Sequence, residues 1–358
     1  MRGKQEQQIT MLSALTPDQL VPRDHPIRRI KPIVEQALKE LSPTFNRMYA
    51  NLGRPSIPPE HLLKASLLIA LYSIRSERQF CERLQYDLLF KWFLDLNIMD
   101  PAFDASSFSK NRERLLEHQV AREFLTAVVT EARRRKLLSE DHFTVDGTLL
   151  EAWASLKSIH SKDGGEPPQP GDRNPDVDFR GKPRANDTHQ SSTDPEARLA
   201  RKGRGKEAKL CFAGHVLMEN RTGLVVDVTV TAATGVAEQD TALDMIEKVS
   251  GSRRITVGAD KGYDTRDFVT VCREMNVTPH VARRKWSIVD ERTTRHEGYR
   301  LSQRIRKRIE EIWGWVKTVG GGSKLRYKGV ERNKLWAELT AAAYNLVRMA
   351  KLAADQAF

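Results

Sequence analysis

The sequence predicts an α/β protein in which an all-helical N-terminal domain (residues 1–137) precedes a mixed-sheet domain (residues 138–358). Three observations support this prediction. Residues 1–137 carry apolar residues at helical spacing with helix-start signals between them. From residue 143, short β-branched runs alternate with helical segments. Two of these runs end at an aspartate, Asp146 and Asp260.

The N-terminal part is predicted to form a series of helices. Prolines near the start of two apolar segments suit the first helical turn, and Ser76 with Gln79 resembles a capping box. Ser106 begins a basic helix that carries Lys110, Arg112 and Arg114. Helices are predicted over residues 27–41, 62–74 and 120–136, with others after the serines at 76 and 106–109.

The second part alternates strands and helices. Strands are predicted over residues 143–148, 210–218, 224–231, 255–260 and 277–281, and helices over residues 240–249, 267–275, 302–318 and 336–353. This is the element order of an RNase H-like fold. Residues 161–197 hold many prolines and few large apolar groups, so residues 161–207 are predicted to form a mobile basic loop.

Charge indicates the class of partner. Lys and Arg number 59 against 47 Asp and Glu, a formal net charge of +12. Residues 283–308 hold ten Lys or Arg and three acids, which favours nucleic acid as the partner. No run approaches the ~18 apolar residues of a membrane span, so no membrane partner is expected. Three widely spaced cysteines match neither a zinc site nor a disulfide framework, which favours the cytoplasm.

Three carboxylates on three elements predict a divalent-metal site, because hard cations prefer oxygen ligands. Asp146 and Asp260 end strands, and Glu310 lies on a late helix. Each acid also has a plainer interpretation, as a turn or solvated-helix residue, and Asp264 is an alternative to Asp260. Periodicity places Glu310 and Glu311 about equally far from the apolar stripe of their helix, so it does not choose between them.

The residues around these acids resemble a known family, the bacterial insertion-sequence transposases of the DDE class, in the branch with a Tyr–Arg–Glu–Lys signature. The resemblance covers nearly the whole chain. The sequences VDGT (residues 145–148) and GADKGYD (258–264) resemble the two Asp motifs, and SQRIRKRIEEIWGWVKT (302–318) resembles the Glu motif. The SERQF sequence (76–80) is similar to the helical domain that precedes the catalytic core.

The resemblance implies roles for individual residues. Asp146, Asp260 and Glu310 are the implied catalytic metal ligands, for Mg²⁺ or Mn²⁺. The signature places Arg four residues before Glu and Lys seven after it, which selects Glu310 over Glu311. Arg306 and Lys317 are then implied phosphate clamps. Gln303 stands where the signature has Tyr, and Tyr299 lies one turn earlier. The implied reaction is cleavage at element ends followed by transfer of the 3′-hydroxyl to target DNA.

Further residues outside the signature are candidate DNA contacts, although the basic residues of the N-terminal helices have an alternative as solvated helix charges and Trp286 could equally lie in the core. The candidates are Lys110, Arg112, Arg114, Lys261, Arg283, Arg284, Lys285 and Trp286. The expected partners are terminal inverted repeats, target DNA and a second copy of the chain, in a nucleoid-associated cytoplasmic protein. The rival functions are an RNase H-like nuclease without strand transfer and a catalytically silent DNA-binding protein.

Overall fold

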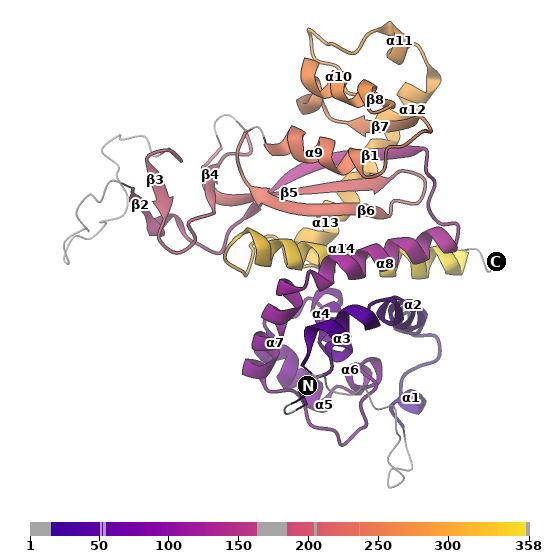
Figure 1. The fold of residues 1–358 in the computed structure, drawn as a ribbon, viewed down its shortest axis with the longest axis vertical. Coiled ribbons are helices and arrows are strands. Elements are labelled where there is room, and N and C mark those ends of the chain that lie inside the picture. Colours follow the sequence, from indigo (N-terminus) through magenta and orange to yellow (C-terminus); the bar gives the residue numbers. More distant parts are fainter. Residues whose placement is uncertain are drawn as a thin grey trace.

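The computed structural model describes residues 16–355, apart from 51, 53–54, 163–184, 204–205 and 236. Its elements lie at three levels (Figure 1). The N-terminal helices are at the bottom of the view and the sheet is above them. Two helices, α8 (Val120–Arg134) and α14 (Val330–Asp355), run between these levels. Within the described residues, no helix combines the length and apolar character that a membrane crossing requires.

The N-terminal helices follow the predicted order. Before α8 the chain forms α1 (Pro17–Leu20), α2 (Ile27–Glu40), α3 (Ser42–Met48), α4 (Pro59–Leu71), α5 (Glu77–Tyr86), α6 (Leu88–Phe93) and α7 (Ala105–Glu117). The Oγ of Ser76 accepts a hydrogen bond from the backbone N of Gln79 at 3.1 Å, so Ser76 caps α5 as expected. The cap of α7 is Asp104 rather than the serines that follow it. A carboxylate at this position also interacts favourably with the positive end of the helix dipole.

The sheet has the predicted mixed topology, and the fold-class prediction is confirmed. Its strands are β1 (His142–Glu151), β4 (Arg198–Ala200), β5 (Lys209–Glu219), β6 (Val225–Ala232), β7 (Ile255–Ala259) and β8 (Val277–Val281). Strand β5 pairs antiparallel with β1 on one side and with β6 and β4 on the other. Strands β7 and β8 then extend the sheet in parallel from β1.

Helices cover both faces of the sheet, so each face is buried. On one face, Val145 and Leu217 share a core with α9 (Ala237–Glu247) and α10 (Arg266–Glu274). On the other face lies α13 (Ile309–Thr318), with Trp313 against Leu150 and Gly214. Because side chains alternate along a strand, Asp146 and Leu150 lie on the α13 face of β1.

The predicted helix over residues 302–318 is divided. Helix α12 (Glu297–Ile305) ends in one turn of 3₁₀ helix (Arg306–Arg308), and α13 follows without a loop. Helix α12 begins five residues before the prediction, after the short helix α11 (Glu291–Thr294). Four basic residues lie within five positions, Arg304 and the three residues of the 3₁₀ turn, and this crowding of like charges disfavours a regular helix there.

Part of the predicted loop at residues 161–207 is ordered. Strands β2 (Ile159–Ser161) and β3 (His189–Ser191) form a two-stranded sheet that projects to the left in Figure 1, and β4 joins the main sheet. Residues 163–184 and 204–205 of the predicted loop lie outside the described residues. The extension continues into Glu196, whose Oε2 accepts a hydrogen bond from the backbone N of Val330 at 2.9 Å. The Glu196 side chain therefore caps the start of α14.

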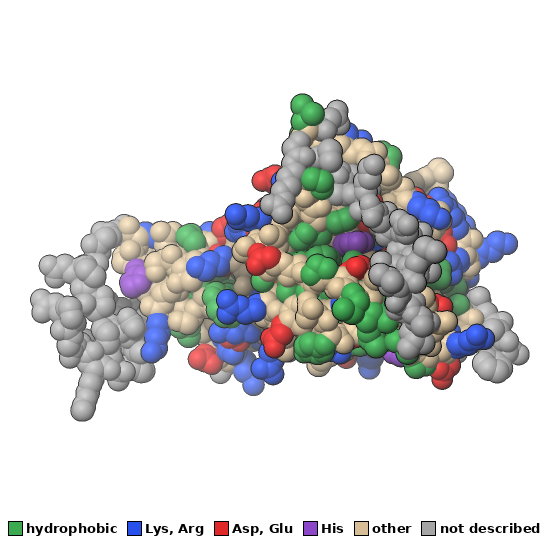
Figure 2. Space-filling model, turned by 90° about the horizontal axis from the view of Figure 1, so that it is seen from below, with side chains coloured by type: hydrophobic (Ala, Val, Ile, Leu, Met, Phe, Trp, Pro, Cys, Tyr) green, Lys and Arg blue, Asp and Glu red, His purple; other side chains and the backbone are tan. Residues whose placement is uncertain are grey.

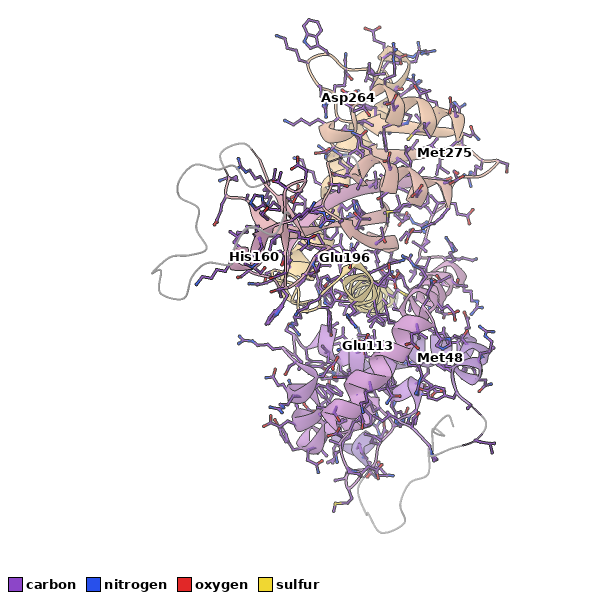
Figure 3. The ribbon with its side chains drawn as sticks, turned by 60° about the vertical axis from the view of Figure 1, so that its left-hand side comes forward. Met48, Glu113, His160, Glu196, Asp264 and Met275 are labelled. Carbon is purple, nitrogen blue, oxygen red and sulfur yellow. The ribbon has the colours of Figure 1, made fainter. Side chains whose placement is uncertain are left out.

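Helix α14 joins the two predicted domains. It packs against α8, α4, α2 and α7 on one side and against β6 and α13 on the other. One hydrophobic core runs from Val21 to Ala350 through both parts. Near its start, Arg332 forms an ion pair with Glu113 of α7, which Figure 3 labels in the helical part. The division at residue 137 remains a prediction, and the last helix of the second domain completes the core of the first.

Candidate active site

Asp146 lies within β1, next to the point where β7 ends. The parallel pairing of β1 with β7 includes Thr144 opposite Gly258. Two residues further along each strand direction, the same register brings Asp146 level with Asp260, the residue that follows β7. Strand β1 itself continues to Glu151, because β5 pairs with it over its whole second half. The prediction that Asp146 ends its strand was therefore wrong, although the parallel part of the sheet does end beside it.

Asp260 stands at the end of β7 and caps a 3₁₀ turn (Lys261–Tyr263). Its Oδ1 accepts a hydrogen bond from the backbone N of Gly262 at 2.5 Å. Its Oδ2 has no hydrogen-bond partner in the described part of the chain. The turn role that the sequence offered as an alternative is thus present, and it leaves one carboxylate oxygen available.

The environment of Asp146 shows that several acids are close together. Burial, followed by the negative charges of Asp260 and Glu238, raises the pKa of Asp146 to about 7. The backbone N–H of Gly147 and the indole of Trp313 oppose this rise. Like charges destabilise one another at short range unless a cation lies between them.

Glu238, to which no sequence motif pointed, lies in the first turn of α9. Its Oε1 accepts a hydrogen bond from the hydroxyl of Tyr263 at 3.0 Å. A Cβ on Gly147 would lie 2.7 Å from the same oxygen, so Glu238 reaches the backbone beside Asp146. The only sequence signal was the glycine that follows Asp146, and it does not indicate which side chain approaches.

Glu310 lies in the first turn of α13. Contacts before and after Glu310 in the sequence hold this part of the chain against the sheet. A Cβ on Gly258 would lie 3.4 Å from the Cβ of Arg306, and the Nζ of Lys317 donates to the Oγ1 of Thr148 at 2.7 Å. Glu310 lies between these two anchors on an exposed stretch of the helix. Among the described residues, its side chain has no hydrogen-bond or ion-pair partner.

The donor set suits a hard divalent cation, since it consists of carboxylate oxygens. Across the described residues, no three His, Cys, Asp or Glu side chains already form a group that could hold a metal ion. Side-chain rotation would therefore have to accompany binding. The indole N–H of Trp313 is directed towards Asp146 but completes no hydrogen bond within the described residues. A buried donor of this kind fits a site that receives further oxygen ligands.

Two models of protein families match the sequence. A model described as "Transposase domain (DUF772)" matches residues 15–114, and one described as "Transposase DDE domain" matches residues 179–346. Together they cover about three quarters of the chain. The chain belongs to the DDE-class insertion-sequence transposases. The second match includes Asp260 and Glu310 but begins after Asp146, so the position of Asp146 rests on the strand register.

Three solved transposase complexes match the chain at low sequence identity. A piggyBac transposase synaptic complex with hairpin DNA has 9% sequence identity and a TM-score of 0.43, over 92% of this chain and 76% of that one. The Mos1 strand transfer complex has 12% identity and a TM-score of 0.20, over 81% and 88%. A Mos1 paired-end complex with Mn has 13% identity and a TM-score of 0.20, over 86% and 100%. No curated protein matches the chain.

Gln303 holds Arg306 in place in this transposase. The Oε1 of Gln303 accepts a hydrogen bond from the Nε of Arg306 at 3.0 Å, and its Nε2 donates to the backbone carbonyl of His280. Tyr299 points elsewhere, because its hydroxyl donates to the carbonyl of Val281 at 2.8 Å. Of the two residues considered for the signature Tyr position, Gln303 is the one that contacts Arg306.

Asp264 holds a basic loop beside the site, in the upper part of the molecule (Figure 3). Its two oxygens accept hydrogen bonds from the backbone N of Arg284 and of Ile288, at 2.7 and 3.2 Å. Asp264 is buried, and through these two hydrogen bonds it clamps the loop. The predicted DNA contacts Arg283 and Lys285 are exposed on this loop.

Two more candidate DNA contacts lie on or next to the same loop. Trp286 is 85% exposed at its tip, with the Nζ of Lys285 5.7 Å from its ring centroid. Lys261 is exposed next to Asp260, and its carbonyl accepts a hydrogen bond from the Nε of Arg284. Arg284 is thus occupied in part by internal contacts, whereas Arg283, Lys285 and Trp286 face solvent. Their contact with DNA stays a prediction.

The basic residues of α7 differ in their surroundings. Arg112 forms ion pairs with Glu77 and Glu113 and lies over the ring of Tyr327. Arg114 lies over another aromatic ring, 4.8 Å from the centroid of Tyr49. Lys110 is exposed. The lower face of the molecule shows Lys and Arg at several separate places with acidic side chains among them (Figure 2). Contact of these three residues with DNA stays a prediction, and within the described part of the chain the Lys110 side chain makes none of the ion pairs or ring contacts that hold the other two.

Proposed function

We propose that this DNA transposase cleaves phosphodiesters at the two ends of an insertion element and joins the released 3′-hydroxyls to target DNA. The observation that carries the proposal is the strand register that brings Asp146 level with Asp260 under the helix of Glu310. Asp146, Asp260 and Glu310 are the proposed ligands of two Mg²⁺ or Mn²⁺ ions. When bound, such ions supply an activated attacking oxygen and neutralise charge at phosphorus.

The protein's own side chains hold the DNA strand at this site. Lys317 and Arg306 stand on the same stretch of helix as Glu310, on either side of it. Two cations so placed bind phosphates next to the scissile bond and keep it in line with the attacking oxygen. The spacing of Arg306, Glu310 and Lys317 supports membership of the Tyr–Arg–Glu–Lys branch, with Gln303 in place of the tyrosine.

Terminal inverted repeats and target DNA are the proposed substrates, and nucleoid association follows from binding them. Concerted insertion needs two active sites at one target, so we propose that two protomers pair the two element ends. Light scattering with and without end DNA tests this stoichiometry. Inverted repeats immediately outside the reading frame would supply the end DNA.

An assay of cleavage and joining tests the activity. Labelled end DNA with target plasmid and Mg²⁺ or Mn²⁺ should yield joined product. Asp146→Asn, Asp260→Asn and Glu310→Gln should each lower cleavage by more than about 100-fold, since even indirect contacts to a metal are worth 10–100-fold. Glu311→Gln is the matched control, because its side chain is exposed and pairs only loosely with Arg348, at 3.5 Å.

The outcomes separate the rival functions. Cleaved ends that are never joined to the plasmid would favour a nuclease. Binding without any cleavage would favour a silent DNA-binding protein. If Glu310→Gln retained activity and Glu311→Gln lost it, the third acid would be Glu311.

A further inference from the structure

Glu238 lies beside the acids of the proposed site but belongs to none of the motifs that define it. It begins α9, on the sheet face opposite to α13. Its carboxylate nevertheless reaches the backbone of β1 at Gly147, one residue after Asp146. The site is therefore approached by carboxylates from β1, β7 and α9, with Glu310 on α13 at the other side.

The loop that follows Asp260 holds Glu238 in this position. The hydroxyl of Tyr263 donates to Oε1 of Glu238 at 3.0 Å. The neighbouring Gln239 donates to the carbonyl of Gly262 at 3.0 Å and accepts from Thr265 at 2.9 Å. The start of α9 and the end of β7 are thus fixed to each other. Any shift of the loop that moves Asp260 moves Glu238 with it.

Gly147 makes room for this carboxylate. A Cβ at Gly147 would lie 2.7, 2.9 and 3.0 Å from Oε1, Cδ and Cγ of Glu238. Real Cβ atoms do not approach other atoms so closely, so any larger residue would displace the side chain. The space that a side chain at residue 147 would occupy is filled by the carboxyl group of Glu238.

An ordinary structural role explains this arrangement less well. An acid in the first turn of a helix is stabilised by the helix dipole while it faces solvent. Glu238 is exposed, yet its carboxylate also lies against Gly147, close to Asp146 and Asp260, where like charges oppose it unless a cation intervenes. The indole N–H of Trp313 adds a second observation. It is buried, is directed towards Asp146, and has no hydrogen-bond partner among the described residues.

We propose that Glu238 supplies a fourth carboxylate to the divalent-cation site, with Tyr263 as its positioning residue. This inference rests on the proposed function, because it assumes that Asp146 and Asp260 bind the cation. It adds a ligand from α9 to the three acids on β1, β7 and α13.

Manganese binding to the full-length protein tests the proposal without measuring activity. Titration of Mn²⁺ followed by electron paramagnetic resonance gives the free ion, and calorimetry gives an independent affinity. Glu238→Gln should weaken Mn²⁺ binding by about 10-fold or more. Glu247→Gln is the matched control, because it removes an exposed acid from the last turn of the same helix. Its affinity should equal that of the wild type.

Two further variants separate ligation from folding. Gly147→Ala should reproduce the loss seen with Glu238→Gln, since the new methyl forces the flexible Glu238 side chain away. Tyr263→Phe keeps the buried ring and removes the hydroxyl, so it should cause a smaller loss. Thermal unfolding without metal should be unchanged for Glu238→Gln, and Mn²⁺ should raise its melting temperature less than that of the wild type.

Asp146→Asn distinguishes the failure of this inference from the failure of the proposed function. If Asp146→Asn loses Mn²⁺ binding while Glu238→Gln and Gly147→Ala bind like the wild type, Glu238 is not a ligand and the three-acid site stands. If Asp146→Asn also binds like the wild type, or the wild type binds no Mn²⁺, the metal site itself is refuted.

Discussion

The Nζ of Lys317 lies 2.7 Å from the Oγ1 of Thr148, so helix α13 is held across strand β1 two residues beyond Asp146. Burial lowers the pKa of Lys317, and the nearby charge of Lys202 adds to this effect, whereas Asp146 opposes it. Lys317 and Lys202 therefore lie close to each other, and Lys317 also lies close to Asp146. This arrangement offers a phosphate a position next to the carboxylates.

Loss of a phosphate clamp should change the salt dependence of DNA binding. With Lys317→Ala or Arg306→Ala, the plot of log affinity against log salt should become shallower by about one unit, since each lost contact releases about one counterion fewer. Lys351→Ala is the control and should leave the slope unchanged, because Lys351 is an exposed residue of α14. Fluorescence anisotropy with end DNA at several salt concentrations measures it. A slope equal to the wild type would remove these residues from the DNA interface.

Trp286 should contribute to DNA binding and not to stability. Its ring is 85% exposed on the loop that Asp264 clamps, so Trp286→Ala should leave the free energy of unfolding unchanged. Stacking of a base on an aromatic ring is worth about 1–3 kcal/mol, so DNA affinity should fall by about 5-fold to 150-fold. Filter binding and urea unfolding measure the two quantities. A destabilised variant with unchanged affinity would contradict this role.

Arg122 should be essential for stability. It forms ion pairs with Asp227 of β6 and Glu338 of α14, whose side chains are 6% and 5% exposed. Without Arg122, Glu338 loses its ion-pair partner and Asp227 keeps only Lys248, so Arg122→Ala should lower the free energy of unfolding by about 3 kcal/mol. Arg134→Ala, on the same helix, is the control, because Arg134 pairs with Glu40 at the surface and should matter little. Equal effects of the two changes would exclude a special role for Arg122.

Glu338 should make stability depend on pH. Burial raises its pKa from the ordinary 4.5 to about 6, although Arg122 opposes the rise. The folded state therefore holds this proton more tightly than the unfolded state does. The stability that results is present below pH 4.5 and is lost, by about 2 kcal/mol, as pH rises through 6. Urea unfolding between pH 4.5 and 7 should show Glu338→Gln losing this dependence. Parallel curves for the two proteins would contradict it.

The sequence predicted the order of elements better than their limits. Strand β8 has the predicted bounds because a proline-containing apolar run stands between clear turns. Strand β1 was predicted to end near Asp146, but it runs to Glu151, because its length depends on pairing with β5. Pairing between distant segments leaves no local signal. The same holds for α14, whose first turn is fixed by a cap from Glu196.

Within the candidate site, residues in motifs could be predicted and residues brought by packing could not. Asp146 and Asp260 follow strand-like runs, and the helix of Glu310 has a recognisable basic face. Glu238 has no such pattern, since only folding brings α9 next to Gly147. The internal role of Arg112 is similar, because its partners Glu77 and Tyr327 are distant in sequence. A cluster of arginines in the sequence predicts a positive charge, but it does not predict whether that charge contacts DNA or pairs with an acid of the same chain.

The position of α14 between the two parts has a consequence for synthesis of the chain. Helices α2, α4 and α8 pack their apolar faces against a segment that begins at Val330. During translation, these helices emerge from the ribosome long before that segment does, so the nascent bundle keeps an open apolar surface until α14 has also been synthesised. A polypeptide cut short before residue 330 would keep that surface uncovered, and chaperones and proteases act on such chains.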